Sequence, residues 1–399
     1  MKLVRTARRG AVAVTGVIVL GLAACSSGSS GSTAAGGSTA AGGSASAGTS
    51  ASAGSGGSGA SSSTAAKVTP INATVHPATS TLCGSKSLTI DYLSAYDTPW
   101  QKISYAEFQK QAAQCPNVKT NYLSASDSVQ QSIANIQGAA AQGVSGIVIY
   151  PVAGEPELPA IEQAFSSGIP VVPFDNLDAG TPGQNYTAYV GIDLTAAGKA
   201  QADALGQALN GKGNVVYLGG PAGTSFTQTV FDGFKSELAA KYPGITILTG
   251  GPVATDYSES DTQQVMAGLF ARYPKIDGLE LDYGAAGAGA LRAFQAANKP
   301  FPDTSAMATD NEFGCLWKND APKSASLFTM DGMTTLSEIA FRKVLAAAAG
   351  TSDPESSTVT AFVSADTAKG LEPKCDTSLP PTADLNGDLT PAQIAAALK

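Results

Sequence analysis

Carboxylate, amide and aromatic side chains follow several short apolar runs of the sequence. Asp97, Trp100 and Gln101 follow the first run, from Leu88 to Leu93. The residues that follow three later elements are Asp175, Asn176, Asp282, Tyr283, Asp310 and Asn311. Carboxylates and amides hydrogen-bond to pairs of adjacent hydroxyl groups, and an aromatic ring covers an apolar C–H face. This combination is typical of a site for a small polar ligand such as a sugar.

A single Asp after a strand is more often a helix N-cap or part of a solvated turn. The argument for a site depends on four carboxylates that share one kind of position, namely Asp97, Asp175, Asp282 and Asp310. In open α/β sheets, ligands bind outside the carboxyl ends of the strands. We therefore expect these four side chains to face one ligand.

The sequence offers little for catalysis or for binding a cofactor. The only histidine, His76, precedes the first expected strand, which excludes a triad that depends on histidine. No GxxxxGK[ST] phosphate loop is present, and the Gly-rich segment 284–289 lacks the third glycine of a dinucleotide site because position 292 is Arg. We expect no cofactor and no enzymatic activity, although a pair such as Asp97 and Asp175 leaves glycosidase chemistry open until their separation is known.

Eight apolar runs are predicted to form strands, and two of them, 147–150 and 215–218, are apolar at every position. Strands of that kind are covered by helices on both faces, so the sheets should be parallel. The eight runs are Leu88 to Leu93, Val118 to Leu123, Gly146 to Tyr150, Pro170 to Phe174, Asn214 to Leu218, Ile245 to Leu248, Asp277 to Leu281 and Ala325 to Phe328.

Helices are predicted between these strands. One apolar helical face consists of Val129, Ile133, Ile136 and Ala140, and a second consists of Phe226, Val230, Phe234 and Leu238. Asp127 is placed to cap the first of these helices, with Gln130 as its partner. Strands that alternate with helices indicate an α/β fold with two doubly wound, parallel-sheet lobes.

The expected lobes are discontinuous in sequence. Residues 85–192 with 331–350 are assigned to the N-terminal lobe, and residues 193–330 with 351–385 to the C-terminal lobe. A crossover strand is expected from Thr358 to Val363. The C-terminal residues 386–399 should contain a short helix that begins at Thr390-Pro391, because Thr is a good N-cap and Pro suits the first helical position.

The first part of the chain has the features of an export signal and a tether. Basic residues precede an apolar run of about a dozen residues, too short to span a bilayer, and we predict a signal peptide over 1–24. Leu22 to Cys25 resembles a lipobox, so Cys25 is the predicted lipidation site that anchors the protein to the outer face of the cytoplasmic membrane. Residues 25–66, rich in Ser, Gly and Ala, should form a flexible tether.

The net charge and the cysteine content bear on the partners of the protein and on its disulfide bonds. The formal net charge is −8, and it becomes −12 when the four basic residues of the predicted signal peptide are removed. Nucleic acid is therefore an unfavourable partner. Apart from Cys25, the cysteines form an even set: Cys83, Cys115, Cys315 and Cys375. Three pairings are possible, and we favour Cys83 with Cys115 and Cys315 with Cys375; no CxxC pair supports a zinc site instead.

Several segments, taken in order and spacing, resemble the type I periplasmic-binding-protein family, specifically its ribose- and xylose-like sugar receptors. The resemblance extends over about Ser87 to Gly350. The segments are Ser94 to Gln101, Gly168 to Asp175, Gly219 to Ser225 with Phe231 to Phe234, and Gly289 to Ala293. The resemblance implies two lobes joined by a three-segment hinge, with a sugar held in the cleft, and a monomer that delivers this ligand to an ABC permease.

The resemblance also implies which residues face the ligand. They are Asp97, Trp100, Gln101, Asp175, Asn176, Tyr257, Tyr283 and Asp310, with Thr227 or Gln228 nearby. Ribose-type receptors usually have two arginines where this chain has Asn176 and Val230. Ribose is therefore a poor fit, and a receptor for a cationic or nucleoside-like ligand remains an alternative. A sensor that presents its ligand to a membrane kinase is a second alternative, which the sequence does not distinguish from transport.

Overall fold

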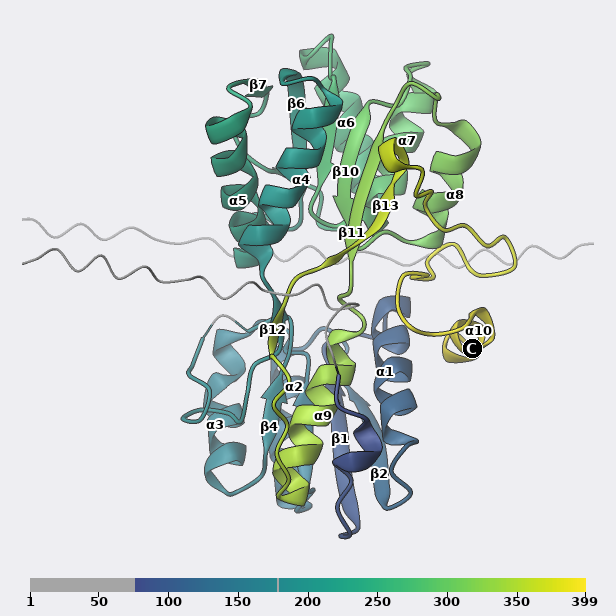
Figure 1. The fold of residues 1–399 in the computed structure, drawn as a ribbon. Helices are drawn as coiled ribbons and strands as arrows, with labels where there is room; N and C mark the ends of the chain where they lie inside the picture. Colours follow the sequence, from purple (N-terminus) through teal and green to yellow (C-terminus); the bar gives the residue numbers. More distant parts are fainter. Residues whose placement is uncertain (1–75, 178) are drawn as a thin grey trace, which may run out of the picture. The chain divides into compact units, whose positions relative to one another are not determined.

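The computed structural model describes residues 76–177 and 179–399 of the chain (Figure 1). The predicted signal peptide, Cys25 and the predicted tether lie outside the described residues. Within the described part, no helix is both long enough and apolar enough to cross a membrane.

The N-terminal lobe is built on a sheet of four parallel strands in the order β2-β1-β3-β4. These strands are β1 (Leu88–Ser94), β2 (Val118–Ser124), β3 (Gly146–Ile149) and β4 (Val171–Pro173). The central strand β3 is buried at all four positions, as its continuous apolar run predicts. The helices around this sheet are α1 (Pro99–Ala112), α2 (Val129–Ala141), α3 (Leu158–Ser166) and α9 (Leu336–Ala349) (Figure 1).

The C-terminal lobe contains a larger sheet in the order β13-β11-β10-β9-β6-β7, with β8 paired to β6. Its strands are β6 (Lys212–Gly219), β7 (Gly244–Ile247), β8 (Val253–Ala254), β9 (Gly278–Leu281), β10 (Asp303–Met307), β11 (Leu327–Asp331) and β13 (Phe362–Asp366). Its helices are α4 (Leu194–Ala208), α5 (Ser225–Lys241), α6 (Glu259–Arg272), α7 (Gly287–Ala296) and α8 (Asn311–Asp320).

The expectation of purely parallel sheets is wrong for one strand. β13 runs antiparallel to β11, because the chain returns from the N-terminal lobe and enters this sheet from the hinge end. The other strands of the sheet pair in parallel. The fold class itself is confirmed, since both lobes have α/β architecture.

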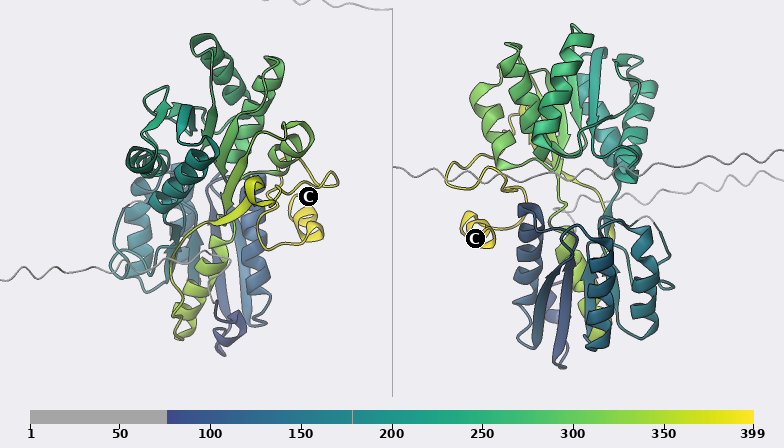
Figure 2. Two further views of the ribbon diagram at one scale, coloured as in Figure 1. Left: turned by 45° about the horizontal axis from the view of Figure 1, so that its top comes forward. Right: turned by 180° about the vertical axis from the view of Figure 1, so that it is seen from behind.

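Three segments connect the lobes (Figures 1 and 2). The first leads from β5 (Gly191–Ile192) to α4, the second from β11 to α9, and the third from α9 through β12 (Thr358–Val359) to β13. β12 and β5 pair in parallel, which ties the first and third segments together. This arrangement is the predicted three-segment hinge.

The predicted cap of α2 is wrong by one residue. Asp127 has a φ of 64°, a left-handed conformation that an N-cap does not adopt. Ser128 is the N-cap instead, and its hydroxyl accepts a hydrogen bond of 3.2 Å from the Gln131 amide. The prediction for the last helix, α10 (Pro391–Ala397), is confirmed: Thr390 caps it, Pro391 is its first residue, and Gln393 completes a capping box.

The structure contains the two favoured disulfides. Cys83 is bonded to Cys115, which joins the segment before β1 to the end of α1. Cys315 of α8 is bonded to Cys375, in the segment that follows β13. The first disulfide lies within the N-terminal lobe, and the second lies within the C-terminal lobe.

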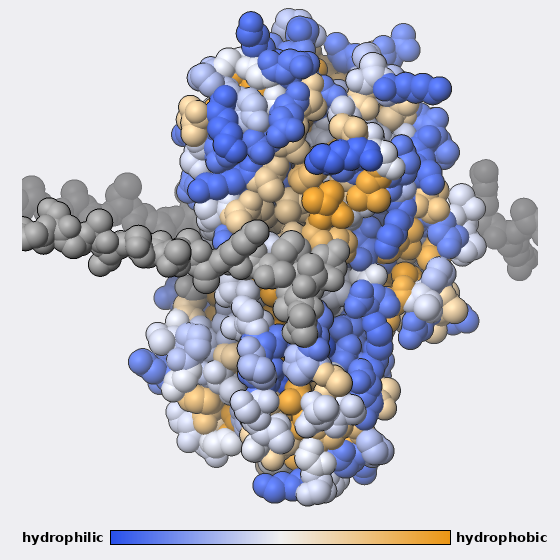
Figure 3. Space-filling model, in the orientation of Figure 1, coloured by the Kyte–Doolittle hydropathy of each residue, from blue (hydrophilic) through white to orange (hydrophobic). Residues whose placement is uncertain are grey.

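The surface in the view of Figure 3 is mostly hydrophilic, with limited apolar areas. Among the described residues, the exposed large apolar side chains are Val363, 41% exposed, and Leu371, 45% exposed. Two such residues do not form an extended apolar face.

Candidate ligand-binding site

The first side chains of the candidate site follow β1, where α1 begins. Thr98 caps α1 by accepting a hydrogen bond from the Gln101 amide. Gln101 is only 1% exposed, and its side-chain oxygen accepts a hydrogen bond of 2.8 Å from the Ser94 hydroxyl. This hydrogen bond holds the end of β1 against the start of α1, so the Gln101 side chain helps to position the candidate site.

Trp100 belongs to a group of rings at the carboxyl end of the small sheet. Its ring lies 5.5 Å from that of Tyr150, edge to face, and Tyr150 lies 5.4 Å from Phe174. The indole N–H of Trp100 is buried and has no hydrogen-bond partner among the described residues. An indole N–H in this state is available to an acceptor on a bound ligand.

Asp97 lies at the edge of this group. It is exposed, and its carboxylate accepts hydrogen bonds from the hydroxyls of Tyr122, at 3.3 Å, and Ser126, at 3.2 Å. Of the four predicted strand-end carboxylates, it is the most exposed; Asp175 and Asp310 are partly exposed and Asp282 is buried.

Asp175 follows β4 and has an unusual backbone conformation, with a φ of 62°. Its amide donates to the Val190 carbonyl at 2.9 Å, and its own carbonyl accepts from the Tyr189 hydroxyl at 2.7 Å. These bonds stabilise a backbone conformation that is strained for any residue other than glycine. Residues with strained backbones are found most often at functional sites. Burial raises the pKa of the Asp175 carboxyl from 3.8 to about 7.

Asn176 is fixed by the loop after β3. Its side-chain nitrogen donates to the carbonyls of Pro151, at 3.0 Å, and Val152, at 3.2 Å. These bonds orient the amide, and they leave its oxygen as the atom suited to a ligand donor.

The C-terminal lobe contributes Asp282, which directly follows β9. It is 1% exposed, and burial raises its pKa from 3.8 to about 7, a rise that donors on Thr227 and Gly220 reduce. Its Oδ2 atom has no hydrogen-bond partner among the described residues. The Thr227 hydroxyl accepts from the Gly220 amide at 3.1 Å and lies 3.4 Å from the Tyr257 hydroxyl.

Tyr257 and Tyr283 form an aromatic pair beside Asp282, with ring centroids 5.0 Å apart and nearly perpendicular planes. Burial raises the pKa of both phenols, and so does the negative charge of Asp175. Because Asp175 belongs to the N-terminal lobe, this electrostatic effect places its carboxylate opposite the two rings. The two halves of the candidate site therefore face each other across the hinge.

Asp310 serves two roles. It is the N-cap of α8, accepting a hydrogen bond of 2.9 Å from the Phe313 amide, which is the ordinary role for an Asp in this position. Its negative charge also raises the pKa of Tyr283, and burial raises the pKa of Asp310 itself to about 7. It is thus a cap that borders the cleft.

Gln228 does not lie with the other predicted ligand-binding residues. It is exposed on α5, and its side-chain nitrogen donates to Asp232, one turn further along the same helix, at 2.8 Å. Of the two residues that the resemblance placed near the ligand on this helix, Thr227 is the one directed inward.

Four residues of the site were not singled out from the sequence. Tyr150 follows β3 and packs against Trp100; it was not selected because the predicted strand extended through Tyr150, one residue beyond the end of β3. Asp331 is the last residue of β11. Asp384 and Asn386 belong to the segment that follows β13. No local sequence pattern indicates them, because their positions depend on how this segment packs.

Three carboxylates of the candidate site, Asp175, Asp282 and Asp310, have no cationic partner among the described residues. Within the described part of the chain, Asp175, Asp282 and Asp310 take part in no ion pair, and no positive charge lowers their pKa. Two arginines form ion pairs with other carboxylates: Arg292 pairs with Glu259 and Glu312, and Arg342 pairs with Glu355. Residues 76–177 and 179–399 also contain no cluster of three His, Cys, Asp or Glu residues suited to a metal ion.

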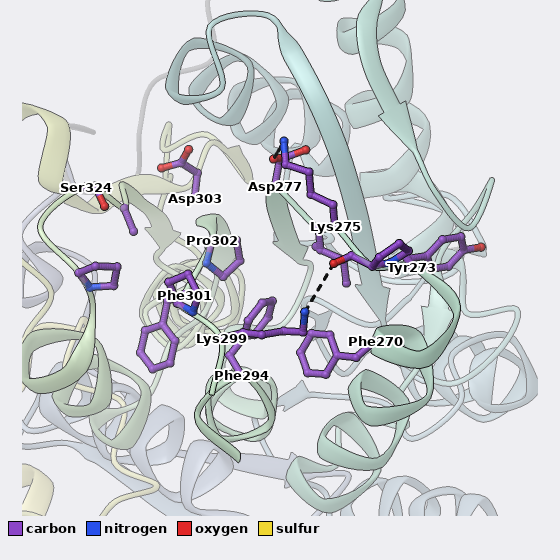
Figure 4. A pocket seen from close by; sticks show the side chains of 15 residues that line it. Phe270, Tyr273, Lys275, Asp277, Phe294, Lys299, Phe301, Pro302, Asp303 and Ser324 are labelled. Atoms are coloured by element: carbon purple, nitrogen blue, oxygen red, sulfur yellow. Dashed lines mark hydrogen bonds and ion pairs between the residues drawn. The ribbon is translucent and has the colours of Figure 1, made fainter. Parts of the chain in front are cut away.

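Two cavities lie away from this cleft. One, of about 380 Å³, is lined by residues that precede β9, β10 and β11, and so lies at the amino ends of those strands (Figure 4). Its lysines already have partners: Lys299 donates to the Pro274 carbonyl and lies over the Phe270 ring, and Lys275 pairs with Asp277. The other cavity, of about 340 Å³, lies between α4 and β11. Ligands of open α/β sheets bind at the opposite, carboxyl ends.

Comparison with known proteins identifies the family to which this arrangement corresponds. Residues 92–331 match the family described as periplasmic binding protein domain. A solute-binding protein of an ABC transporter from Bacillus halodurans, solved with bound myo-inositol, superposes with a TM-score of 0.61 over 70% of this chain and 94% of that one, at 17% identity. This likeness concerns the fold.

Two curated relatives match part of the sequence. The xylitol-binding protein of Mycolicibacterium smegmatis is 32% identical over 34% of this chain and 38% of its own length. The ribose import binding protein of Haemophilus influenzae is 29% identical over 37% of this chain and 49% of its own length. The chain thus matches less than half of the length of either relative.

We predict that the cleft carboxylates destabilise the protein without ligand as pH rises. An Asp whose pKa is about 7 when folded and 3.8 when unfolded holds its proton more tightly in the folded state. Its contribution to stability is therefore complete below about pH 4 and is lost as pH rises through about 7. Replacing Asp282 with Asn should raise the Tm at about pH 8, by about 2 °C or more, and raise it by less at about pH 5.

Differential scanning calorimetry of the ligand-free protein at both pH values measures this effect. Asp97→Asn is the matched control, because Asp97 is exposed and the same substitution there should leave both Tm values almost unchanged. A lower Tm for Asp282→Asn at the higher pH would show that Asp282 is compensated in the folded protein, contrary to this interpretation.

Proposed function

Because the chain belongs to the periplasmic binding protein domain family, we propose that it captures a monosaccharide between its lobes and delivers it to an ABC importer. The family consists of solute-binding proteins that work outside the cytoplasm, not of enzymes. The observation that supports a sugar most directly is the set of buried carboxylates, Asp175, Asp282 and Asp310, which lie beside aromatic rings and without cations.

Desolvated carboxylates require compensation from hydrogen-bond donors or from a positive charge. A monosaccharide offers several hydroxyl donors, and the faces of Trp100, Tyr257 and Tyr283 suit its apolar C–H surface. The names of the proteins compared above agree, since xylitol, ribose and myo-inositol are all uncharged and rich in hydroxyls. The same carboxylates would repel an anionic sugar acid or sugar phosphate.

Capture would take place by hinge closure. The proposed contacts come from both lobes, Trp100 and Asp175 from one and Tyr257 and Asp282 from the other. A ligand that binds both halves stabilises the closed arrangement relative to the open one. A permease can then distinguish loaded from empty protein by the distance between the lobes.

We further propose that the mature protein is a monomeric lipoprotein. Its lipid on Cys25 would hold it at the outer face of the cytoplasmic membrane, and the tether over 25–66 would let the lobes reach the permease. The support for this part is the signal peptide and lipobox in the sequence.

A cationic ligand is the second candidate, and one specific observation favours it: Asp282 Oδ2 is buried and has no donor among the described residues. Aromatic rings also attract cations. Ionic strength separates the two candidates, since the affinity for a cation falls as salt rises while that for a neutral sugar changes little.

Isothermal titration calorimetry tests the proposal with neutral pentoses, hexoses and polyols, an amino sugar, a nucleoside and a sugar acid, each at low and high salt. We expect binding of at least one neutral compound, with little dependence on salt, and no binding of the sugar acid. Salt-dependent binding of a cation with no neutral compound bound would contradict the proposal.

Trp100→Ala should weaken the binding of that neutral ligand by about tenfold or more, corresponding to about 1 to 3 kcal/mol for a lost aromatic contact. The ring lies at the surface of its cluster, so the fold should persist. Tyr273→Ala is the matched control, because it removes a partly buried ring at the far end of the C-terminal sheet. Equal affinities of the two variants, with a lower Tm for Trp100→Ala, would make Trp100 a packing residue.

A further inference from the structure

The segment after β13 is held firmly by the C-terminal lobe. The Cys315–Cys375 disulfide fixes it to α8, and the Asn311 side chain donates to the carbonyls of Asp376, at 2.8 Å, and Leu379, at 3.2 Å. The Asn311 amide donates to the Ala383 carbonyl at 2.8 Å. We call residues 371–399 the tail; these contacts attach the part of it up to Ala383 to α8.

The next residues of the tail lie under the carboxylates of the candidate site. Asp384 forms an antiparallel bridge with Asp310. Asn386 donates from its side chain to Asp331 at 2.8 Å and to the Thr309 carbonyl at 3.2 Å. The charges of Asp384 and Asp331, like that of Asp310, raise the pKa of Tyr283. The tail therefore positions two strand-end carboxylates, Asp310, which follows β10, and Asp331, the last residue of β11.

The chain then passes to the other lobe within two residues. Gly387 packs so closely that a Cβ there would lie 2.4 Å from Glu107 Oε1 and 2.9 Å from Thr334 Oγ1. The Asp388 amide donates to Glu107 Oε1 at 2.7 Å, and its carbonyl accepts from Lys110 at 3.1 Å. Glu107 and Lys110 belong to α1, in the N-terminal lobe.

The tail also packs against α1 in an apolar cluster, which joins Ile103 of α1 to Leu379, Ala383, Leu389 and Ile394 of the tail. Ile103 of α1, 1% exposed, packs with Leu389, 8% exposed, and with Ile394 of α10, 3% exposed. This attachment is separate from the three hinge segments.

We propose that the tail is a strap between the lobes, which positions the carboxylates at one end and holds α1 at the other, and so favours the closed, ligand-competent arrangement. Asn386 and Asp388 are only two residues apart and are bonded to different lobes. Separation of the lobes on this side must therefore detach the strap from α1 or from the site. The effect on affinity rests on the proposed function, whereas the effect on lobe separation does not.

Ile394→Asp tests the strap by placing a charge in the apolar cluster on α1. Ala392→Asp is the matched control, because it adds the same charge to the same helix at an exposed position. Spin labels attached through unnatural amino acids at positions 131 and 240, exposed on α2 and α5, report the distance between lobes and leave the native cysteines intact. We expect Ile394→Asp, but not Ala392→Asp, to shift the ligand-free distance distribution to longer values.

Affinity gives the second readout, measured by calorimetry with the neutral sugar that the wild type binds. Ile394→Asp should weaken binding about fivefold or more, since affinity falls with the population of the competent arrangement. Gly387→Val should act in the same direction without adding charge, because its side chain would displace the strap from Glu107 and Thr334.

The outcomes separate the two proposals. Distance distributions of both variants that equal those of the control would overturn the strap. If the distances shift but affinity does not, the strap holds the lobes without assisting the site, and the coupling is wrong. If the wild type binds none of the compounds, the proposed function fails, while the distance measurement still decides whether the strap exists.

Discussion

The burial of carboxylates without cationic partners is the constraint on which the rest of this structure depends. Asp175, Asp282 and Asp310 lie at strand ends in two lobes, and burial is the largest cause that raises the pKa of each to about 7. A protein selected only for stability would replace or pair such groups. Their presence in the cleft is understandable if a ligand supplies the missing donors, and the aromatic rings beside them indicate that this ligand has hydroxyl groups and an apolar face.

The fold explains how so few elements bring these groups together. Parallel strands end at one edge of each sheet, and the three hinge segments place those edges opposite each other. The same geometry gives the tail its position, because a segment that leaves the C-terminal sheet after β13 reaches α1 across the hinge. The site, the hinge and the strap are thus consequences of one topology.

The sequence predicted the features that depend on local patterns of residues, and it did not predict those that depend on tertiary packing. Apolar runs predicted β1, β3 and β4 and therefore Asp175. The element expected before Asp310 is β10, which was not predicted as a strand because Asp303–Met307 is largely polar. The antiparallel β13 could not be inferred, since strand direction depends on where the chain re-enters the sheet. Gln228 and Thr227 are adjacent in sequence, and only the packing of α5 decides which of them points inward. Asp384 and Asn386 are set by tertiary contacts of the tail and leave no local pattern.

The central claim is that buried, partly protonated carboxylates accept the hydroxyl groups of an uncharged ligand. Hydrogen bonds to the ionised form lower the pKa of a carboxyl, so such a ligand must displace protons when it binds near pH 7. Calorimetry of one neutral sugar at a fixed pH slightly below 7, in buffers of different ionisation enthalpy, measures the protons exchanged. The account predicts net release of protons; binding with no release, or with uptake, would contradict it.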